Sequence, residues 1–335
     1  MEPAAKRCKL DITQEVEEPQ TPIDVLHELY PEIREHIIGF LDKKDRFNYG
    51  MSAKYCNEDI QRFDRDCPDA VFIYERDNGL ELNLSYSLKN RVGYALEFEE
   101  CGENEYRIRM TLKNGELLKD ESNIVKEGNA VEEAWKYLKR RFKYLKGEKK
   151  VKSLDVHMKK WPTEKLNSIR RLKEATYIGM TIGEDNYEDI IKYISDNNHI
   201  TSIDIKGGEE FKLPATFYKH PVIKKLEIAQ FQVGCDIDEE DLMEMKAYNM
   251  EYQSSNITDK GINGKIKQWY NGERNTMELS IGNYSLISPD DLLADLQAIP
   301  SKKCQFRRPI DGMIGTLSIR NDTITFYADH DNIVY

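Results

Sequence analysis

Six short stretches decide the fold of this chain, and in each of them apolar and polar residues alternate. They are VKSLDVHM (residues 151–158), EATYIGMTI (174–182), ITSIDIKG (200–207), VIKKLEIAQ (222–230), AYNMEYQSS (247–255) and TMELSIGNY (276–284). Alternation with a period of two is typical of a β-strand that buries one of its faces. The sequence therefore predicts six strands between residues 151 and 284.

Helical segments separate several of these strands: NYEDIIKYISDN (186–197), DEEDLMEMK (238–246), TDKGINGKIKQWYNG (258–272) and SPDDLLADLQAI (288–299). The strands begin about 22–29 residues apart, which is similar to the period of leucine-rich repeats, in which each unit supplies a strand and a helix. The units are poor in leucine and uneven in length, so we expect an irregular, leucine-rich-repeat-like βα solenoid. GTLSIRNDTITFYADH (315–330) predicts a closing hairpin.

Residues 65–128 predict a β-rich connector built from hairpins. DAVFIYERDNGLELNLSYSL (69–88) alternates on both sides of Asn78-Gly79, and an Asn-Gly pair is the preferred turn of a two-residue hairpin. GYALEFEECGENEYRIRMTLKNG (93–115) predicts two further strands. Residues 129–146 predict a helix, because their apolar residues recur at helical spacing.

Composition and charge exclude several classes of protein. The 335 residues carry a formal charge of −11, no run approaches the roughly 18 apolar residues of a membrane span, and the N-terminus lacks the apolar core of a secretory signal. Six cysteines form no Cys-x-x-Cys pair, and six histidines show no metal-ligand spacing. We expect a nuclear or cytoplasmic protein with no membrane association, no metal and no cofactor.

Residues 23–64 predict a small helical unit. Pro31 suits the first turn of a helix, where its missing N–H would have no partner, and Glu32 follows at the positive end of the helix dipole. Apolar residues then recur at helical spacing from Ile33 to Leu41. Because so short a unit cannot cover its own apolar stripe, the stripe packs either on the chain's own hairpins or on another protein.

The same segment resembles an F-box. The resemblance rests on Leu29-Tyr30-Pro31-Glu32-Ile33, Ile37-Ile38, the run from Leu41 to Asn48, and Ser52-Ala53-Lys54, with departures from the family pattern at Tyr30, Tyr49-Gly50-Met51 and Ala53. In that family the motif docks on a Skp-type adaptor, which connects it to the cullin scaffold of a cullin-RING (SCF-type) ubiquitin ligase. The resemblance implies adaptor contacts by Leu29, Pro31, Ile33, Ile37, Ile38, Leu41 and Phe47.

The C-terminal half resembles the F-box-associated domain of expanded nematode F-box families. The resemblance rests on NITDKGIN (256–263), on WYNG (269–272), and on Arg308 with Asp311-Gly312 before the last hairpin. It implies that this half selects a protein client for the ligase, with Trp269 supporting the fold. The chain would then be the substrate-recognition subunit of the ligase.

The expected architecture is a mixed α+β and α/β chain in four parts. A disordered tail covers residues 1–22, the F-box covers 23–64, the β-rich connector covers 65–128, and the repeat-like α/β domain with its C-terminal hairpin covers 129–335.

A basic run lies between Lys136 and Lys173, where fifteen Lys and Arg residues stand against three acids. Such a run is usually a solvated surface. It would also attract an acidic or phosphorylated client, for which the candidate residues are Lys139, Arg140, Arg141 and Lys143. A third interpretation, RNA binding by these bases and neighbouring aromatics, is disfavoured by the acidic remainder of the chain.

The tail sequence PAAKRCKLD (3–11) resembles a monopartite nuclear-import signal. Lys6, Arg7 and Lys9 would bind the acidic groove of an importin. Short basic motifs also match by chance, so a basic tail without this role is the alternative.

The sequence contains no phosphate-binding G-x-x-x-x-G-K loop, no G-x-S-x-G elbow and no H-E-x-x-H zinc motif. We therefore expect a receptor without catalytic residues of its own. The alternative to a ligase subunit is an interaction module or nuclear factor that uses the same domain outside a ligase.

Overall fold

The computed structural model describes residues 29–41, 45–46, 49, 67–87, 92–114, 117–143, 150–208, 210–254, 256–284, 288–299, 302–320 and 322–329. The chain divides into two compact units, Met1–Asp64 and Arg65–Tyr335. Within the described ranges, no helix is both long enough and apolar enough to span a membrane. The predicted tail (with Lys6, Arg7 and Lys9) and Phe47 lie outside the described residues.

The first unit contains helix α2 (Pro31–Phe40). Pro31 occupies its first turn, as the sequence predicts, and the chain leaves the helix at Leu41, which is extended. The Arg46 side chain donates hydrogen bonds to the carbonyl oxygens of Leu41 (2.9 Å) and Gly39 (3.0 Å). These bonds satisfy carbonyls that have no partner within the last turn of a helix.

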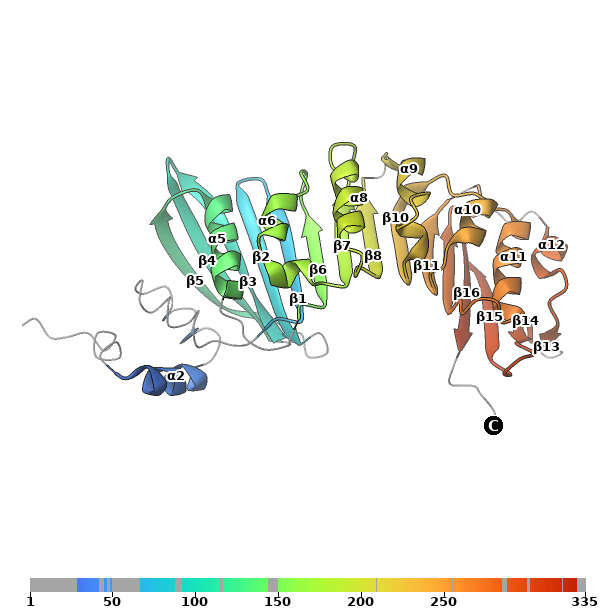
Figure 1. Cartoon of the computed structure of the whole chain (residues 1–335), viewed down its shortest axis with the longest axis horizontal. Coiled ribbons are helices and arrows are strands. Elements are labelled where there is room, and N and C mark those ends of the chain that lie inside the picture. Colours follow the sequence, from blue (N-terminus) through green and yellow to red (C-terminus); the bar gives the residue numbers. More distant parts are fainter. Residues whose placement is uncertain are drawn as a thin grey trace, which may run out of the picture. The chain divides into compact units, whose positions relative to one another are not determined.

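The second unit is built on one continuous sheet, with its helices along one face (Figure 1). Neighbouring strands follow the order β13-β14-β15-β16-β12-β11-β10-β8-β7-β6-β1-β2-β3-β4-β5, with β9 beside β10. The strands are β1 (Ala70–Arg76), β2 (Gly79–Ser87), β3 (Val92–Gly102), β4 (Glu105–Asn114), β5 (Leu117–Glu127), β6 (Ser153–His157), β7 (Tyr177–Ile182), β8 (Ser202–Gly207), β9 (Lys212–Leu213), β10 (Ile228–Cys235), β11 (Asn249–Gln253), β12 (Glu278–Gly282), β13 (Ala298–Ile299), β14 (Lys302–Arg307), β15 (Ile314–Arg320) and β16 (Thr323–Asp329). The helices are α5 (Ala130–Lys143), α6 (Thr163–Asn167), α7 (Arg170–Lys173), α8 (Tyr187–Asp196), α9 (Ala215–Tyr218), the 3₁₀ turn η1 (Ile223–Lys225), α10 (Glu239–Glu244), α11 (Asp259–Tyr270) and α12 (Pro289–Leu293).

The centre of the sheet is parallel, and both of its ends are antiparallel. Strands β1, β6, β7, β8, β10, β11 and β12 pair in parallel, in that order. Hairpins β1–β2, β3–β4 and β15–β16 form where the alternating sequences predict them. The turn between β1 and β2 consists of Asp77 and Asn78, one residue before the predicted Asn78-Gly79 pair, and Gly79 already belongs to β2. The predicted mixed α/β composition is therefore confirmed.

The sheet runs without interruption across the boundary expected at residue 128. Strand β6 pairs in parallel with β1, and the backbone N–H of Lys152 donates to the Asp69 carbonyl oxygen at 2.8 Å. The free edge of the first hairpin therefore receives the next strand, since an unpaired edge offers a row of donors and acceptors. Strands β1 to β5 form one end of the large sheet.

A single row of apolar side chains shows how the core is built. Strand pairing aligns Val71, Leu154, Ile178, Ile203, Ala229, Met250, Leu279 and Phe326. All of them are fully buried. Because successive side chains on a strand point to opposite faces, this row lies on the helix-covered face and its neighbours lie on the other.

An aromatic cluster lies where helix α11 packs on strand β16. Trp269 is fully buried, its ring lies 5.0 Å from that of Phe326, and the Arg308 guanidinium lies 5.3 Å from the Trp269 ring. A Cβ on Gly315 would come within 2.8 Å of Trp269, so this position requires glycine. Residues of the WYNG and Arg308 motifs thus form core.

The segment 288–299 departs from its prediction. A helix was expected throughout, but α12 ends at Leu293 and the chain then enters strand β13. Ala294 is extended, and Asp295 has a φ of 61°, which no continuing helix allows.

Candidate interaction surfaces

Helix α2 carries an apolar arc that is buried at one edge and exposed at the other. Ile38 is 3% exposed, whereas Ile33 is 46% and Phe40 80% exposed. Among the other predicted adaptor contacts, Leu29, Ile37 and Leu41 are half-buried, and the side chains of Pro31 and Phe47 lie outside the described ones. The predicted adaptor contacts therefore fall into two groups. Ile38 already packs within the chain, whereas Ile33 is accessible to a partner.

Phe40 and Tyr30 extend the exposed edge, and the sequence analysis missed both. Phe40 follows Ile33 by seven residues and Ile37 by three, which places all three on one side of a helix. Tyr30, which precedes the helix, is 76% exposed. The His36 ring packs edge-on against Phe40 at 5.0 Å. The helical spacing itself was the signal that would have identified Phe40.

The second surface is the face of the sheet opposite the helices, which we call the open face. It is defined by the aligned row Phe72, Asp155, Gly179, Asp204, Gln230, Glu251, Ser280 and Thr325. Each of these residues is the strand neighbour of a buried core residue. The open face is accordingly polar over most of its length, with aromatic residues at β1.

Aromatic and acidic groups meet where β1, β6, β7 and β8 cross the open face. The Tyr74 ring stacks on the His157 imidazole with centroids 4.8 Å apart, and His157 Nδ1 lies 2.8 Å from Thr181 Oγ1. The Tyr177 hydroxyl donates to the Asp204 carboxylate at 3.4 Å. The side chains are thus held in place by contacts between neighbouring strands.

Burial and mutual repulsion change the proton affinity of these groups. Burial raises the pKa of Asp155, and the nearby Asp204 charge adds to the effect. Glu251 also has a raised pKa, caused by burial and by Asp204 and Glu278. Burial and Lys206 lower the pKa of His157. A ligand group that brings positive charge or hydrogen-bond donors would relieve the repulsion between the carboxylates.

A pocket of about 310 Å³ opens where β1, β6 and β7 end. It is lined by Glu75, Arg76, Asp77, His157, Met158, Lys159, Thr181, Ile182, Gly183, Glu184, Asp185 and Asn186. Several of its polar groups already have partners: Lys159 N–H donates to Glu75 at 2.6 Å, Arg76 pairs with Glu81, and the Asn186 amide bonds to Met158, Thr181 and Gly183. These contacts brace the loops around the pocket.

The predicted client-binding bases lie on α5, which packs on the helix-covered face. Lys139, Arg140 and Lys143 are exposed. Arg141 is buried and its guanidinium donates to the Tyr86 hydroxyl at 3.2 Å. The assignment of Arg141 to a client-binding surface is therefore corrected: its side chain points into the protein because it follows Leu138 by three residues on the apolar face of the helix.

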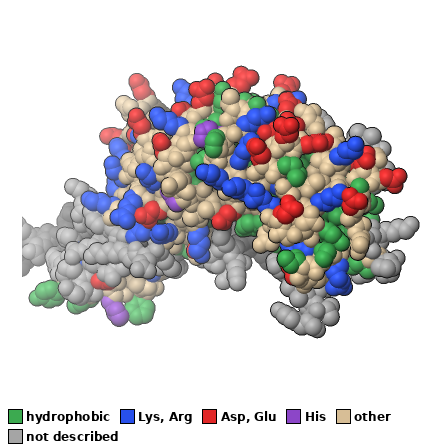
Figure 2. All heavy atoms as spheres, turned by 45° about the vertical axis from the view of Figure 1, so that its right-hand side comes forward, with side chains coloured by type: hydrophobic (Ala, Val, Ile, Leu, Met, Phe, Trp, Pro, Cys, Tyr) green, Lys and Arg blue, Asp and Glu red, His purple; other side chains and the backbone are tan. Residues whose placement is uncertain are grey.

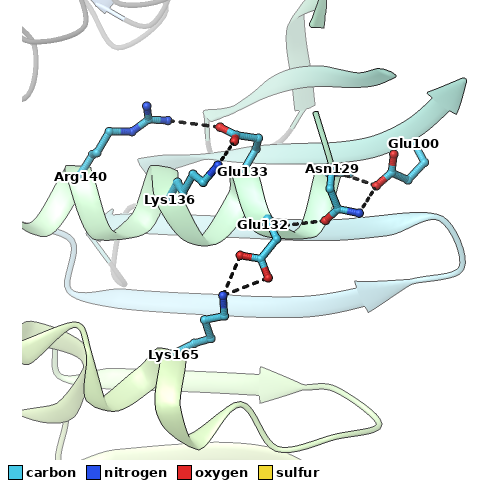
Figure 3. Close-up of polar contacts among 8 residues, drawn as sticks. Glu100, Asn129, Glu132, Glu133, Lys136, Arg140 and Lys165 are labelled. Atoms are coloured by element: carbon cyan, nitrogen blue, oxygen red, sulfur yellow. Dashed lines mark hydrogen bonds and ion pairs between the residues drawn. The ribbon is translucent and has the colours of Figure 1, made fainter. Parts of the chain in front are cut away.

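Ion pairs neutralise part of the basic run around α5 (Figure 3). Lys165 binds Glu132 at 2.8 Å, and Glu133 binds both Lys136 (2.5 Å) and Arg140 (3.8 Å). At the start of the helix, Asn129 accepts a hydrogen bond from the Glu132 N–H and donates one to Glu100. On the face drawn in Figure 2, basic and acidic side chains are interspersed.

The described residues offer no group of three or more His, Cys, Asp or Glu side chains arranged to hold a metal ion. Of the thiols in this part of the chain, Cys67 and Cys235 are buried, and Cys101 and Cys304 are exposed. Burial raises the pKa of Cys235 to about 12, so its thiol stays protonated at neutral pH and is a poor nucleophile.

Comparison with known proteins adds no assignment to this geometry. No model of a known protein family matches the chain, and no curated protein matches it.

Proposed function

We propose that this protein is a non-catalytic substrate-recognition subunit of a cullin-RING ubiquitin ligase. Its N-terminal unit binds a Skp-type adaptor that connects it to the cullin, and its large sheet binds the client. The protein acts by proximity, holding client lysines near the ubiquitin-conjugating enzyme. The proposal includes a nuclear or cytoplasmic location, with import through Lys6, Arg7 and Lys9.

The exposed edge of α2 is the observation that carries the proposal. Tyr30, Ile33 and Phe40 leave apolar side chains in solvent on a helix that begins at Pro31, within the segment that resembles an F-box. Each aliphatic or aromatic side chain that a partner buries contributes about 1.5–3 kcal/mol. The exposed edge supplies such groups for an adaptor, whereas Ile38 is already buried.

The client surface that we propose is the open face. The parallel strands β6, β7, β8, β10, β11 and β12 begin at residues 153, 177, 202, 228, 249 and 278, and a helix or turn follows each of them. Backbone hydrogen bonds connect the start of one strand to the start of the strand before it. The Tyr177 N–H donates to the Lys152 carbonyl oxygen (3.1 Å), and the Tyr248 N–H donates to the Glu227 carbonyl oxygen (2.9 Å). This regularity supports a leucine-rich-repeat-like solenoid, an architecture that presents long binding surfaces.

The test is capture of a purified Skp-type adaptor by the full-length chain. The double variant Ile33→Asp with Phe40→Asp should weaken capture at least about a hundredfold, because two apolar contacts are replaced by carboxylates that would be buried without partners. Binding is measured by biolayer interferometry, and circular dichroism checks that the sheet is intact.

Gly39→Asp is the matched control. It places the same carboxylate on the other side of α2, where an added Cβ meets nothing within 4 Å. Capture should survive this change. If the double variant binds the adaptor as well as the natural chain does, α2 is not the docking helix. If the natural chain shows no binding, the protein is an interaction module that works outside a ligase.

A further inference from the structure

A basic groove of about 540 Å³ lies where β10, β11 and β12 begin. Its lining residues are Lys219, Pro221, Lys224, Lys225, Met243, Glu244, Lys246 and Arg274. It shares no residue with α2, with the row that defines the open face, or with the bases of α5.

Three successive connections supply the bases. Lys224 and Lys225 belong to the turn η1 before β10, Lys246 follows α10 before β11, and Arg274 follows α11 before β12. The Lys246 N–H donates to the Lys224 carbonyl oxygen at 3.0 Å, and the Arg274 N–H donates to the Gln268 carbonyl oxygen at 3.1 Å. The backbone that carries the bases is therefore fixed before any ligand arrives.

Acidic partners balance only part of this charge. Lys224 pairs with Glu244 and lies 3.5 Å from Asp241, and Lys219 lies 3.3 Å from the same buried Asp241. Lys225, Lys246 and Arg274 have no ion-pair partner among the described residues. The groove therefore holds an excess of positive charge.

A buried lysine lies close enough to Arg274 for the two charges to repel each other. Lys265 is 1% exposed and donates to the Met245 carbonyl oxygen at 2.6 Å, at the end of α10. Burial and the charge of Arg274 lower the pKa of Lys265 to about 8. An anion beside Arg274 would reduce that repulsion.

Basic residues near helix ends also have a simpler role, because they complement the negative end of the helix dipole. That role accounts for Lys246 after α10, and it acts only within the last turn of a helix. It does not account for Arg274, four residues beyond α11, nor for the convergence of three connections on one hollow.

We propose that this groove binds a phosphate group, either as a free phosphate anion or as a phosphate ester. A guanidinium and two flexible ammonium groups give several charge-assisted hydrogen bonds to the oxygens of one dianion. Phosphate binding by this groove does not depend on the proposed role as a ligase subunit.

The test is isothermal titration calorimetry on the full-length chain with inorganic phosphate and with O-phosphoserine. The triple variant Lys225→Gln, Lys246→Gln and Arg274→Gln should weaken binding at least about tenfold. The control variant Lys192→Gln, Lys212→Gln and Lys260→Gln removes the same charge from exposed positions outside both the groove and the basic run. Its affinity should stay within about twofold of the natural value.

The two probes distinguish the sources of the phosphate: tighter binding of O-phosphoserine identifies an ester, and tighter binding of inorganic phosphate identifies the free anion. Glu244→Gln should tighten binding, since it removes one of the two carboxylates beside Lys224 and so makes the groove more positive, and it provides the test if the triple variant does not fold. The proposal fails if the natural chain shows no saturable binding, if both triple variants lose affinity equally, or if Glu244→Gln leaves affinity unchanged.

Discussion

Two basic residues, Arg141 and Lys265, are buried and so do not contribute to the surface charge that the sequence suggests. Arg141 belongs to the basic run in the sequence, yet its guanidinium lies inside the protein against Tyr86. Lys265 is also buried, and its ammonium caps Met245 at the end of α10. Both side chains act on the stability of the fold, so neither can be counted as surface charge.

Lys265 makes the stability of the protein depend on pH above neutrality. Its pKa is about 8 in the folded chain against an ordinary value of 10.5, so between these values the unfolded chain binds a proton that the folded chain does not. Stability therefore rises with pH in this window. Relative to Lys265→Met, the natural chain should gain about 2 kcal/mol between pH 8 and pH 10.

Urea unfolding at pH 7, 8, 9 and 10 measures this difference. Lys260→Met is the control, because Lys260 is exposed on the same helix, and its curve should run parallel to the natural one. Parallel curves for Lys265→Met as well would show that the buried ammonium does not titrate in this range.

Buried polar side chains hold the loops that follow the parallel strands. The Asn186 amide, after β7, donates to the carbonyl oxygens of Met158 and Thr181 (both 3.2 Å) and accepts from the Gly183 N–H (2.9 Å). Further along the sheet, the Ser254 hydroxyl after β11 donates to the Ile237 carbonyl oxygen at 2.9 Å. The contacts with Met158 and Ile237 each tie a loop to the loop after the preceding strand.

Asn186→Ala should destabilise the protein by about 1–3 kcal/mol, because it leaves buried backbone groups without partners. Asn198→Ala changes an exposed asparagine near the end of α8 and should cost less than about 0.5 kcal/mol. Chemical unfolding monitored by circular dichroism gives both values. Equal losses in the two variants would mean that the amide contacts add nothing to stability.

At the scale of the whole molecule, the large sheet and its core belong to one unit. The buried row from Val71 to Phe326 lies entirely within Arg65–Tyr335. Helix α2 belongs to the other unit, Met1–Asp64. The fragment 65–335 should therefore fold alone, with a thermal midpoint within about 3 °C of the full chain.

Differential scanning calorimetry of the fragment and the full chain checks this expectation. The fragment should also fail to capture a Skp-type adaptor. A fragment without a cooperative transition would show that the N-terminal unit is needed for the sheet to fold, and adaptor capture by the fragment would move the proposed docking site away from α2.

The local elements were predictable because their causes are local. Alternating runs on both sides of a short polar turn produce the hairpin of β1 and β2, Pro31 is suited to the first turn of a helix, and the alternation around Ile203 and Ile205 requires one buried face. The sequence analysis failed for Arg141 and for residues 294–299, where packing on Tyr86 and a left-handed Asp295 override the local pattern.

The sequence by itself determined the central strands, the hairpins and several of the helices, and which side of each is apolar. Only the tertiary structure decided that β6 joins the edge of β1, that Ile38 is covered while Phe40 is exposed, and that Lys225, Lys246 and Arg274 line one groove. The periodicity of apolar residues shows only which side of a strand or helix is buried. The pairing of strands and the gathering of charges depend on contacts between residues far apart in the chain, which no local pattern encodes.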